Sequence, residues 1–245
     1  MFVRDLSAQY RQTYFGYLWA FLPPLVASLT FIFLQGQGIV NAEGVGMPYA
    51  AFAMIGTLLF QTFVESIQSP VTAVINAKPM LSKINFPREA ILMGGLYMVV
   101  FNFLIRLLML AGVMAIWHVT PGWTLLLFPL VAFGMLLCGF AVGMALLPIG
   151  TLYQDVGKVI PIVAQFWMLL TPVVYPAQTE GLAGWLATWN PISPLLATAR
   201  ATLTGQPLTF LPAATIVTIS AFMFSVAGLV AFRLVLPRLI ERMGG

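Results

Sequence analysis

The sequence predicts an all-α integral membrane protein with six transmembrane helices. The chain of 245 residues is 60% hydrophobic and only 7% charged, and its mean hydropathy is +0.97. Apolar stretches of about 20 residues recur along it, and at about 1.5 Å per helical residue each matches the ~30 Å hydrocarbon core of a bilayer. The stretches are too long and too uniformly apolar for the alternating strands of a membrane barrel, and backbone groups inside lipid need partners within their own helix. The sequence therefore predicts transmembrane α-helices.

The six spans are delimited by the Gly, Pro and charged residues around each apolar stretch. Their approximate ranges are 17–35, 50–68, 91–117, 123–147, 159–175 and 212–234. Six spans put both termini on the same side of the membrane. Nine of the 11 Lys and Arg residues flank the spans on that side, namely Arg4, Arg11, Lys78, Lys83, Arg88, Lys158, Arg233, Arg238 and Arg242. The positive-inside rule places this side, with both termini, in the cytoplasm.

An amphipathic helix is expected over residues 1–16, lying at the cytoplasmic interface before the first span. Apolar and aromatic residues recur there at helical spacing, while Arg4 and Arg11 occupy the other side. The apolar run that follows is too long for a cleaved signal peptide, so the segment is expected to be retained. It is either a simple membrane anchor or a surface that also contacts a cytoplasmic partner.

The connection between spans two and three, residues 69–90, is predicted to be a charged cytoplasmic loop. It carries Lys78, Lys83, Arg88 and Glu89, and a smaller charged platform, Asp155 with Lys158, lies between spans four and five. A chain with so few charged residues has little use for such a loop unless another molecule docks there. The loop therefore suggests a membrane subunit with a cytoplasmic partner.

Residues 176–211, between spans five and six, are predicted to form a re-entrant helical hairpin in the outer leaflet. Their two apolar pieces, about 182–189 and 194–204, are too short to cross a bilayer and too apolar for open water. The break is expected at Asn190-Pro191, because the residue before a proline avoids the helical conformation. Trp185 and Trp189 would then lie at headgroup depth. The hairpin is either an interfacial anchor or an outer gate.

Four residues within or beside the spans stand out as candidate functional residues. Arg106 falls in the middle of span three, where an ionisable group faces either a substrate path or a polar partner on a neighbouring helix or protomer. Phe166, Trp167 and Tyr175 on span five form either an aromatic track for sugars or ordinary helix packing.

Several function classes are excluded by what the sequence lacks. Gly157-Lys158 is followed by Val159 and has no upstream glycine at the P-loop spacing, so the chain does not hydrolyse ATP alone. His118 is the single histidine and Cys138 the single cysteine, which excludes an intrachain disulfide and a Cys/His zinc site. The net charge of +4 is explained by residues flanking the spans rather than by nucleic-acid binding. No metal or cofactor is expected on this chain.

An ordered set of short motifs runs along most of the chain. The motifs are Arg4-Asp5-Leu6, Tyr10-Arg11-Gln12-Thr13, Gly16-Tyr17-Leu18-Trp19-Ala20, Asn85-Phe86-Pro87-Arg88-Glu89, Tyr153-Gln154-Asp155-Val156, Thr171-Pro172-Val173-Val174-Tyr175-Pro176, and Trp189-Asn190-Pro191 with Arg200 and Gly205. In this order they resemble the ABC-2 type permeases of polysaccharide exporters, the family that exports O-antigen, capsule and teichoic acid precursors. Gln154 stands where that family often has Arg before the Asp.

The resemblance implies one ABC-2 transmembrane domain over residues 1–245 in the bacterial inner membrane. It implies a homodimer that pairs with two soluble ATPase subunits, which bind the ATP and Mg, and that passes a lipid-linked glycan outward. The residues that would contact the ATPases are Arg4, Arg11, Lys78, Lys83, Arg88, Glu89, Asp155 and Lys158; the outer gate would comprise Trp185, Trp189, Asn190, Pro191 and Arg200. Two alternatives remain: an ABC-2 permease for a drug, lipid or small metabolite, and a non-transport membrane scaffold or enzyme subunit.

Overall fold

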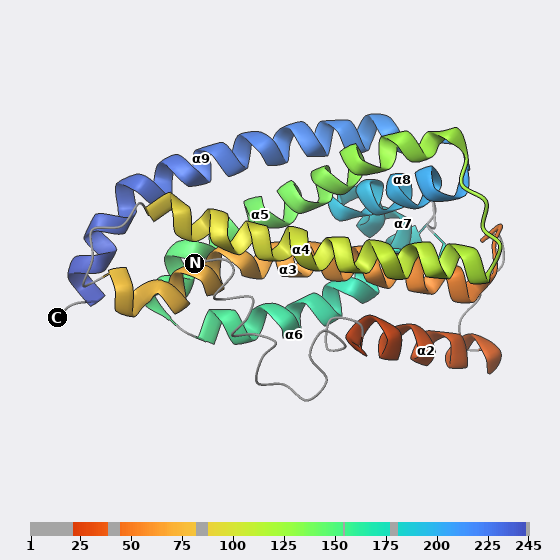
Figure 1. Ribbon diagram of the computed structural model, residues 1–245, viewed down its shortest axis with the longest axis horizontal. Coiled ribbons are helices and arrows are strands. Elements are labelled where there is room, and N and C mark those ends of the chain that lie inside the picture. The colour runs from red at the N-terminus through yellow and green to blue at the C-terminus, as the bar shows by residue number, and fades with distance from the viewer. Residues whose placement is uncertain (1–21, 39–44, 82–87, 154, 177–180, 244–245) are drawn as a thin grey trace.

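The computed structural model describes residues 22–38, 45–81, 88–153, 155–176 and 181–243, and these residues form helices and no strands. Figure 1 shows α3, α4, α5 and α9 running along the long axis, with α2 and α6 on one flank. The all-α prediction is confirmed for the described residues. The elements are α2 (Leu22–Gly36), α3 (Tyr49–Leu81), α4 (Arg88–Ile116), the short 3₁₀ helix η2 (Trp123–Leu127), α5 (Phe128–Leu152), α6 (Asp155–Leu170), α7 (Gly181–Trp189), α8 (Ile192–Thr204) and α9 (Leu211–Met243).

Four segments of this bundle are helical, long and apolar enough to cross a membrane: Tyr49–Ala77, Glu89–Ile116, Trp123–Leu152 and Leu211–Leu234. They match the predicted second, third, fourth and sixth spans. The two remaining candidates are shorter, because α2 has 15 residues and α6 has 16. The chain is therefore a multi-pass membrane protein by length and composition, and the count of six spans stays a prediction. The interface helix predicted over 1–16 lies outside the described residues.

The fifth predicted span, 159–175, differs from the helix that the structure contains. Helix α6 begins at Asp155 and ends at Leu170, so it starts and stops earlier than the apolar pattern suggests. It ends there because Pro172 has no N–H to donate and disfavours a helical conformation at the residue before it. The Thr171 hydroxyl instead donates to the carbonyl oxygen of Trp167 at 2.8 Å. Residues 171–176 leave the helix as an irregular segment.

The predicted cytoplasmic loop over 69–90 is largely helical, which corrects the sequence prediction. Helix α3 continues to Leu81 and α4 begins at Arg88, while residues 82–87 lie outside the described part of the chain. The extension of α3 is stabilised by packing, since Val71 and Val74 are fully buried in the core. A Cβ on Gly150 of α5 would lie 2.6 Å from Cγ1 of Val71, so the two helices touch there. The apolar pattern underestimated α3 because polar residues such as Thr72 and Asn76 interrupt the extension, although over 69–77 Asn76 alone is exposed.

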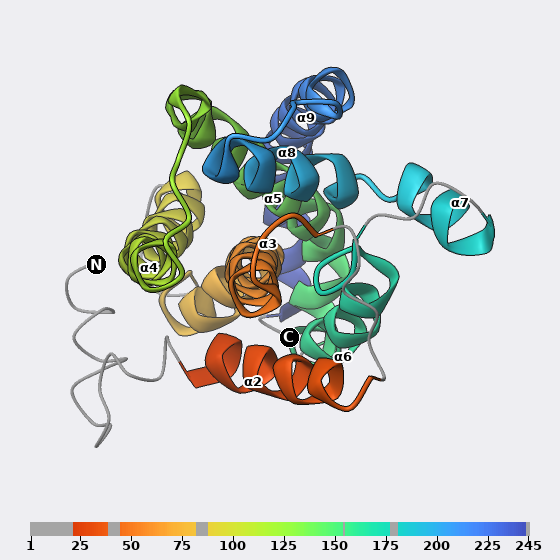
Figure 2. The same ribbon diagram turned by 90° about the vertical axis from the view of Figure 1, so that its right-hand side faces the viewer.

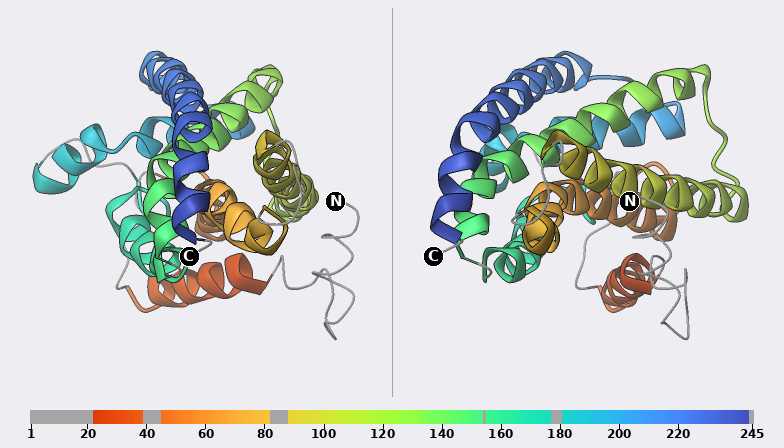
Figure 3. Two further views of the ribbon diagram at one scale, coloured as in Figure 1. Left: turned by 90° about the vertical axis from the view of Figure 1, so that its left-hand side faces the viewer. Right: turned by 60° about the vertical axis from the view of Figure 1, so that its left-hand side comes forward.

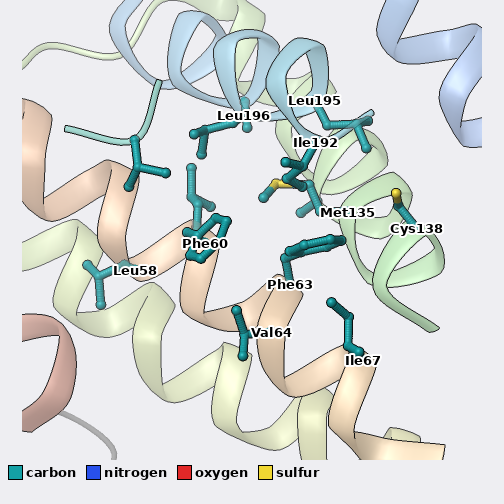
Figure 4. Packing of buried hydrophobic residues seen from close by; sticks show 14 of the residues in the cluster. Leu58, Phe60, Phe63, Val64, Ile67, Met135, Cys138, Ile192, Leu195 and Leu196 are labelled. Atoms are coloured by element: carbon teal, nitrogen blue, oxygen red, sulfur yellow. The ribbon is translucent and has the colours of Figure 1, made fainter. Parts of the chain in front are cut away.

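Helix α3 is the central element of the bundle. Most of its span, 83% of the most apolar window, is buried inside the protein. Figure 2 shows α3 in the middle, with α2, α4, α5, α6 and α8 around it. In Figure 4, Phe63 and Ile67 of α3 pack together with Met135 and Cys138 of α5 and with Ile192 of α8.

Two glycines four residues apart let α5 pack directly on the backbone of α3. A Cβ on Gly139 would lie 2.6 Å from the carbonyl oxygen of Phe63, and one on Gly143 would overlap the carbonyl oxygen of Ile67. Small residues at this spacing are typical of closely packed membrane helices. The contact fixes α5 against the most buried helix of the fold.

In the part of the chain that the structure describes, charged residues gather at one end of the bundle. The ends of α3, α5 and α9 and the beginnings of α4 and α6 lie together, at the left of Figure 1. The residues that the sequence assigns to the cytoplasm are on or near these helix ends: Lys78, Arg88, Asp155, Lys158 and Arg233. The shared position agrees with a single charged membrane face, although which face is cytoplasmic stays a prediction.

The helix break predicted at Asn190-Pro191 is confirmed, since α7 ends at Trp189 and α8 begins at Ile192. The two helices do not lie side by side. Figures 2 and 3 show α7 beyond one end of α8 and projecting from the bundle. The re-entrant position of this pair in the outer leaflet stays a prediction.

Candidate functional site

A buried arginine joins α8, α3 and the segment that follows α6. Arg200 donates from Nη2 to the carbonyl oxygen of Val173 at 2.7 Å and to that of Phe52 at 3.4 Å, and from Nη1 to the carbonyl oxygen of Pro172 at 3.3 Å. The Phe52 ring lies 3.6 Å from the guanidinium carbon. The Tyr49 hydroxyl donates to the carbonyl oxygen of Val174 at 2.8 Å. We call this set, Arg200 with Tyr49, Phe52 and the carbonyls of 172–174, the arginine clamp.

The backbone of α3 leaves room for the clamp only because residue 56 is glycine. A Cβ at Gly56 would overlap both the carbonyl oxygen of Val173 and the guanidinium of Arg200. Burial lowers the pKa of Arg200 to about 9, so the side chain remains charged at neutral pH. Carbonyl oxygens and an aromatic face therefore hold a full positive charge inside the protein.

A second polar cluster lies on the same segment and fixes the break between α7 and α8. Asn190 donates from Nδ2 to the Thr171 hydroxyl at 2.7 Å, and its Oδ1 accepts from the Trp167 indole at 3.1 Å and from the backbone N–H of Ile192 at 3.3 Å. Asn190 is buried, unlike its neighbours Trp189 and Pro191. The side chain thus ties the start of α8 to the end of α6.

The two gate tryptophans lie on the projecting helix α7. Trp185 and Trp189 are both exposed, with ring centroids 6.4 Å apart at an interplanar angle of 51°. Their exposure suits an interfacial position. Their headgroup depth and their role in a gate stay predictions.

Arg106 has a partner on the neighbouring helix. Its Nη2 forms an ion pair with Oε1 of Glu65 on α3, and its Nη1 donates to the Thr62 hydroxyl at 3.2 Å. Asn102, one turn away, donates to the other carboxylate oxygen of Glu65 at 3.3 Å. The geometry favours the structural pairing over the substrate path as the role of Arg106, because the guanidinium is buried between α3 and α4.

The charged residues predicted to contact an ATPase fall into three groups. Arg4, Arg11 and Lys83 lie outside the described residues, whereas Lys78 lies in α3 and Arg88 begins α4. Lys158 and Asp155 form an exposed pair at 3.8 Å in the first turn of α6. Oε1 of Glu89 forms an ion pair with Nε of Arg233 on α9 at 2.6 Å, a contact that the sequence did not indicate.

The three aromatic residues of the predicted track do not share one face. Phe166 is exposed on the outer side of α6. Trp167 points inward, where its ring meets Phe63 edge-on with centroids 5.3 Å apart. Tyr175 lies beyond the helix and donates its hydroxyl to the carbonyl oxygen of Leu169 at 2.9 Å. Phe166 therefore remains as the track candidate of this helix, and Trp167 has a packing role.

Sequence reasoning missed Glu65, Tyr49 and Thr171 as members of these clusters. Glu65 carried a usable signal, because it is an acidic residue within the second apolar stretch. Tyr49 carried none, since its hydroxyl bonds to a backbone carbonyl, and Thr171 appeared only as part of a family motif. Within the described ranges, no group of three or more His, Cys, Asp or Glu residues lies where it could hold a metal ion.

Buried arginines that brace a bundle of apolar helices, together with charged helix ends gathered at one end, are features of a multi-pass membrane protein. A sequence model of the ABC-2 type transporter family matches residues 1–204, and the chain belongs to this family. The resemblance noted in the sequence is thus confirmed.

Curated relatives are similar over most of the chain. The O-antigen export system permease protein RfbA of Myxococcus xanthus is 26% identical over 205 residues, which cover 81% of this chain and 76% of the relative. A Klebsiella pneumoniae protein of the same name is 22% identical over 241 residues, which cover 97% of this chain and 91% of the relative. The similarity to the second relative therefore extends into α9.

Proposed function

We propose that this chain is the permease subunit of an ATP-driven exporter that moves a lipid-linked polysaccharide, such as O-antigen, across the bacterial inner membrane. The similarity to O-antigen export permeases over nearly the whole chain carries the proposal. In this proposal two copies form the membrane part, and two ABC ATPase subunits bind the ATP and Mg. Both termini lie in the cytoplasm.

The apolar outer faces of α2 and α6 support two parts of this proposal, namely that both helices span the membrane and that they contact a second copy of the chain. Both helices flank α3 on one side of the bundle (Figure 2) and present apolar side chains outward. Such surfaces are unsuited to water and need lipid or another protein. We infer that α2 and α6 complete the six spans and meet the same helices of a second copy. The exposed residues are Leu22, Val26, Leu29 and Phe33 on α2, and Val159, Ile162, Val163, Phe166, Leu169 and Leu170 on α6.

The polar residue Gln165 supports a path for a hydrated cargo along α6. It is exposed beside Phe166 on a helix whose outward face is otherwise largely apolar. An amide in lipid leaves hydrogen bonds unmade, whereas a passing glycan would accept and donate them. An aromatic face next to it can stack on pyranose rings. The arginine clamp would hold the outer end of this path, because it fixes the segment after α6.

Export in a strain that lacks its own O-antigen permease tests the proposal. The chain is expressed with its ATPase subunit, and surface glycan is compared with the same pair carrying an inactivated ATPase site. The proposal expects ATPase-dependent surface glycan. Export of a lipid or drug without glycan would instead assign the smaller cargo, and a lack of any ATP-dependent transport would favour the scaffold.

Reporter fusions test the orientation independently of cargo. Fusions after Gly245 and within residues 82–87 are expected to report the cytoplasm, and fusions near Glu43 and Glu180 the outside. A C-terminus outside the cell would be incompatible with six spans and an internal N-terminus.

A further inference from the structure

Helices α4 and α9 border a recessed groove of about 390 Å³ on the surface of the bundle. Its walls come from both helices, and its floor includes Phe140 of α5. Leu92 and Phe140 are nearly fully buried, so the groove reaches below the outer side chains of the flanking helices. Its apolar lining includes Leu92, Met93 and Leu96 of α4 and Val226 and Val230 of α9.

The groove opens toward the bilayer. The spans of α4 and α9 are only 28% and 17% buried within the chain, compared with 83% for α3. Their outward faces are apolar, as lipid contact requires. Away from Glu89 and Arg233 the lining of the groove is apolar and offers no polar partners to hold water, so hydrocarbon is the natural filling of that part.

One end of the groove is charged. Glu89 lies in the first turn of α4, and its ion pair with Arg233 of α9 is therefore at the end of the bundle where the charged helix ends gather. Charged side chains near the ends of membrane helices reach the headgroup region, so we place the ion pair at that depth. Arg233 keeps 68% of its side chain exposed while its Nε contacts Glu89, so the guanidinium can still donate to an anion from the membrane surface.

We propose that this groove is a binding site for one glycerophospholipid of the surrounding membrane. An acyl chain lies among Leu92, Met93 and Val226, over Phe140. The phosphodiester accepts hydrogen bonds from Arg233. The charge of the phosphodiester complements the guanidinium, and its attachment to the chain places it at the depth of the ion pair.

The size of the groove favours a lipid chain over a helix of a second copy. A helix with its side chains is about 10 Å across and rises about 5.4 Å per turn, so a single turn occupies about 400 Å³. The whole groove would be filled by one turn, whereas protomer interfaces extend along several turns. An extended acyl chain fits a narrow recess of this volume.

Native mass spectrometry of the full chain, released from detergent after incubation with defined lipids, tests the site. The probes are phosphatidylglycerol and a neutral diglucosyl diacylglycerol with the same acyl chains. We expect the wild type to retain phosphatidylglycerol in preference to the glycolipid. Arg233→Gln should lower the apparent affinity for phosphatidylglycerol about tenfold, the size of one charge-assisted hydrogen bond.

Matched variants separate the site from the stability of the bundle. Glu89→Gln breaks the same ion pair but keeps the guanidinium, so it should retain phosphatidylglycerol. Val226→Trp should fill the groove and exclude both lipids, whereas Ile219→Trp, on an exposed position of α9 outside the groove, should leave binding as in the wild type. Thermal unfolding of each variant confirms that it is folded.

Three results would overturn the proposal. Equal retention of lipid by Val226→Trp and Ile219→Trp would place the bound lipid elsewhere. An equal loss in Arg233→Gln and Glu89→Gln would assign the effect to the ion pair rather than to a phosphate contact. Conversion of an oligomer to a monomer by Val226→Trp would make the groove a protomer interface.

Discussion

Arg200 of α8 stacks its guanidinium on the Phe52 ring of α3, with the guanidinium carbon 3.6 Å from the ring centroid. The same side chain donates to the carbonyl oxygen of Val173 at 2.7 Å. Within the described residues no carboxylate forms an ion pair with Arg200, so carbonyl dipoles and the ring stabilise its charge. One residue thus connects two helices to the irregular segment between α6 and α7.

Replacing Arg200 by Lys is expected to destabilise the protein. A lysine ammonium is a compact charge that cannot reproduce the planar fork toward three carbonyl oxygens. Each carbonyl left unsatisfied inside the protein costs about 1–3 kcal/mol. Thermal unfolding of the purified protein measures the loss, and Arg233→Lys, at an exposed ion pair, is the matched control with little expected change. Equal unfolding temperatures for Arg200→Lys and the wild type would contradict the clamp.

The α3–α5 contact predicts a second destabilisation, at Gly143. Gly143→Val adds a Cβ that would overlap the carbonyl oxygen of Ile67, so the helices must separate, and overpacking of this kind costs about 1–3 kcal/mol. Gly112→Ala is the control, because nothing lies within 4 Å of the added Cβ. We expect lower thermal stability and less folded protein for Gly143→Val alone. Similar losses in both variants would indicate a general intolerance of larger side chains.

Much of the fold was predictable because the length of each apolar stretch can be counted in the sequence. The ranges of the second, third, fourth and sixth spans and the break at Asn190-Pro191 followed from composition and proline chemistry. The helical extension of α3 did not, since Val71 and Val74 are buried by contact with residues distant in sequence. The early end of α6 had a local signal, because a proline at position 172 disfavours a helix at Thr171. The prediction followed the apolar residues that continue to 175 instead, and so placed the end of the helix too late.

The Arg106–Glu65 pair predicts non-additive mutations. Glu65→Leu alone leaves the guanidinium buried without its carboxylate, and breaking such a pair costs about 3–5 kcal/mol when both charges are fully buried. The Glu65 side chain is 29% exposed, so the lower end is expected. The double variant Glu65→Leu with Arg106→Met should recover most of the loss. A double-mutant cycle of unfolding free energies measures the coupling, and strict additivity would show that the two side chains do not interact.

The candidate site was only partly predictable, because a sequence shows which charged residues would be costly to bury but not which groups they contact. Arg106 stood out as a charged residue in the middle of a span, Arg200 was named through the family resemblance, and both are buried. Their partners are a glutamate 41 positions earlier and three backbone carbonyls, and backbone acceptors have no sequence signature. Arg200 was predicted to be part of an outer gate. Its contacts show that it holds α8 and α3 to the segment 172–174, and the gate role stays a prediction.

Charge reversal at Arg88 tests the predicted contact with the ATPase. Arg88 begins α4 at the charged end of the bundle, so Arg88→Glu should impair transport-linked ATP hydrolysis while membrane insertion stays normal. Hydrolysis is measured on the co-purified complex. Lys158→Glu provides the comparison at the smaller platform. If the Arg88→Glu complex assembled and hydrolysed ATP normally, the positive charge at this position would serve only to set the membrane topology.

The neighbouring residues Phe166 and Trp167 are expected to separate transport from stability. Phe166 is 66% exposed on α6, so Phe166→Ala removes little packing and should lower glycan export at an unchanged protein level. Trp167 contacts Phe63 and donates to Asn190, so Trp167→Ala should lower stability by about 3–5 kcal/mol, and export should fall with protein abundance.

Surface glycan divided by the amount of folded protein distinguishes the two effects. Phe224→Ala, an exposed aromatic on α9 away from α6, is the control for loss of an outward ring and should leave this ratio unchanged. A reduced ratio for Phe166→Ala alone would support a path along α6, because Trp167→Ala acts through the number of folded molecules. An unchanged ratio for Phe166→Ala would remove the aromatic path, and the outward face of α6 would then serve only as a surface for lipid or a second copy.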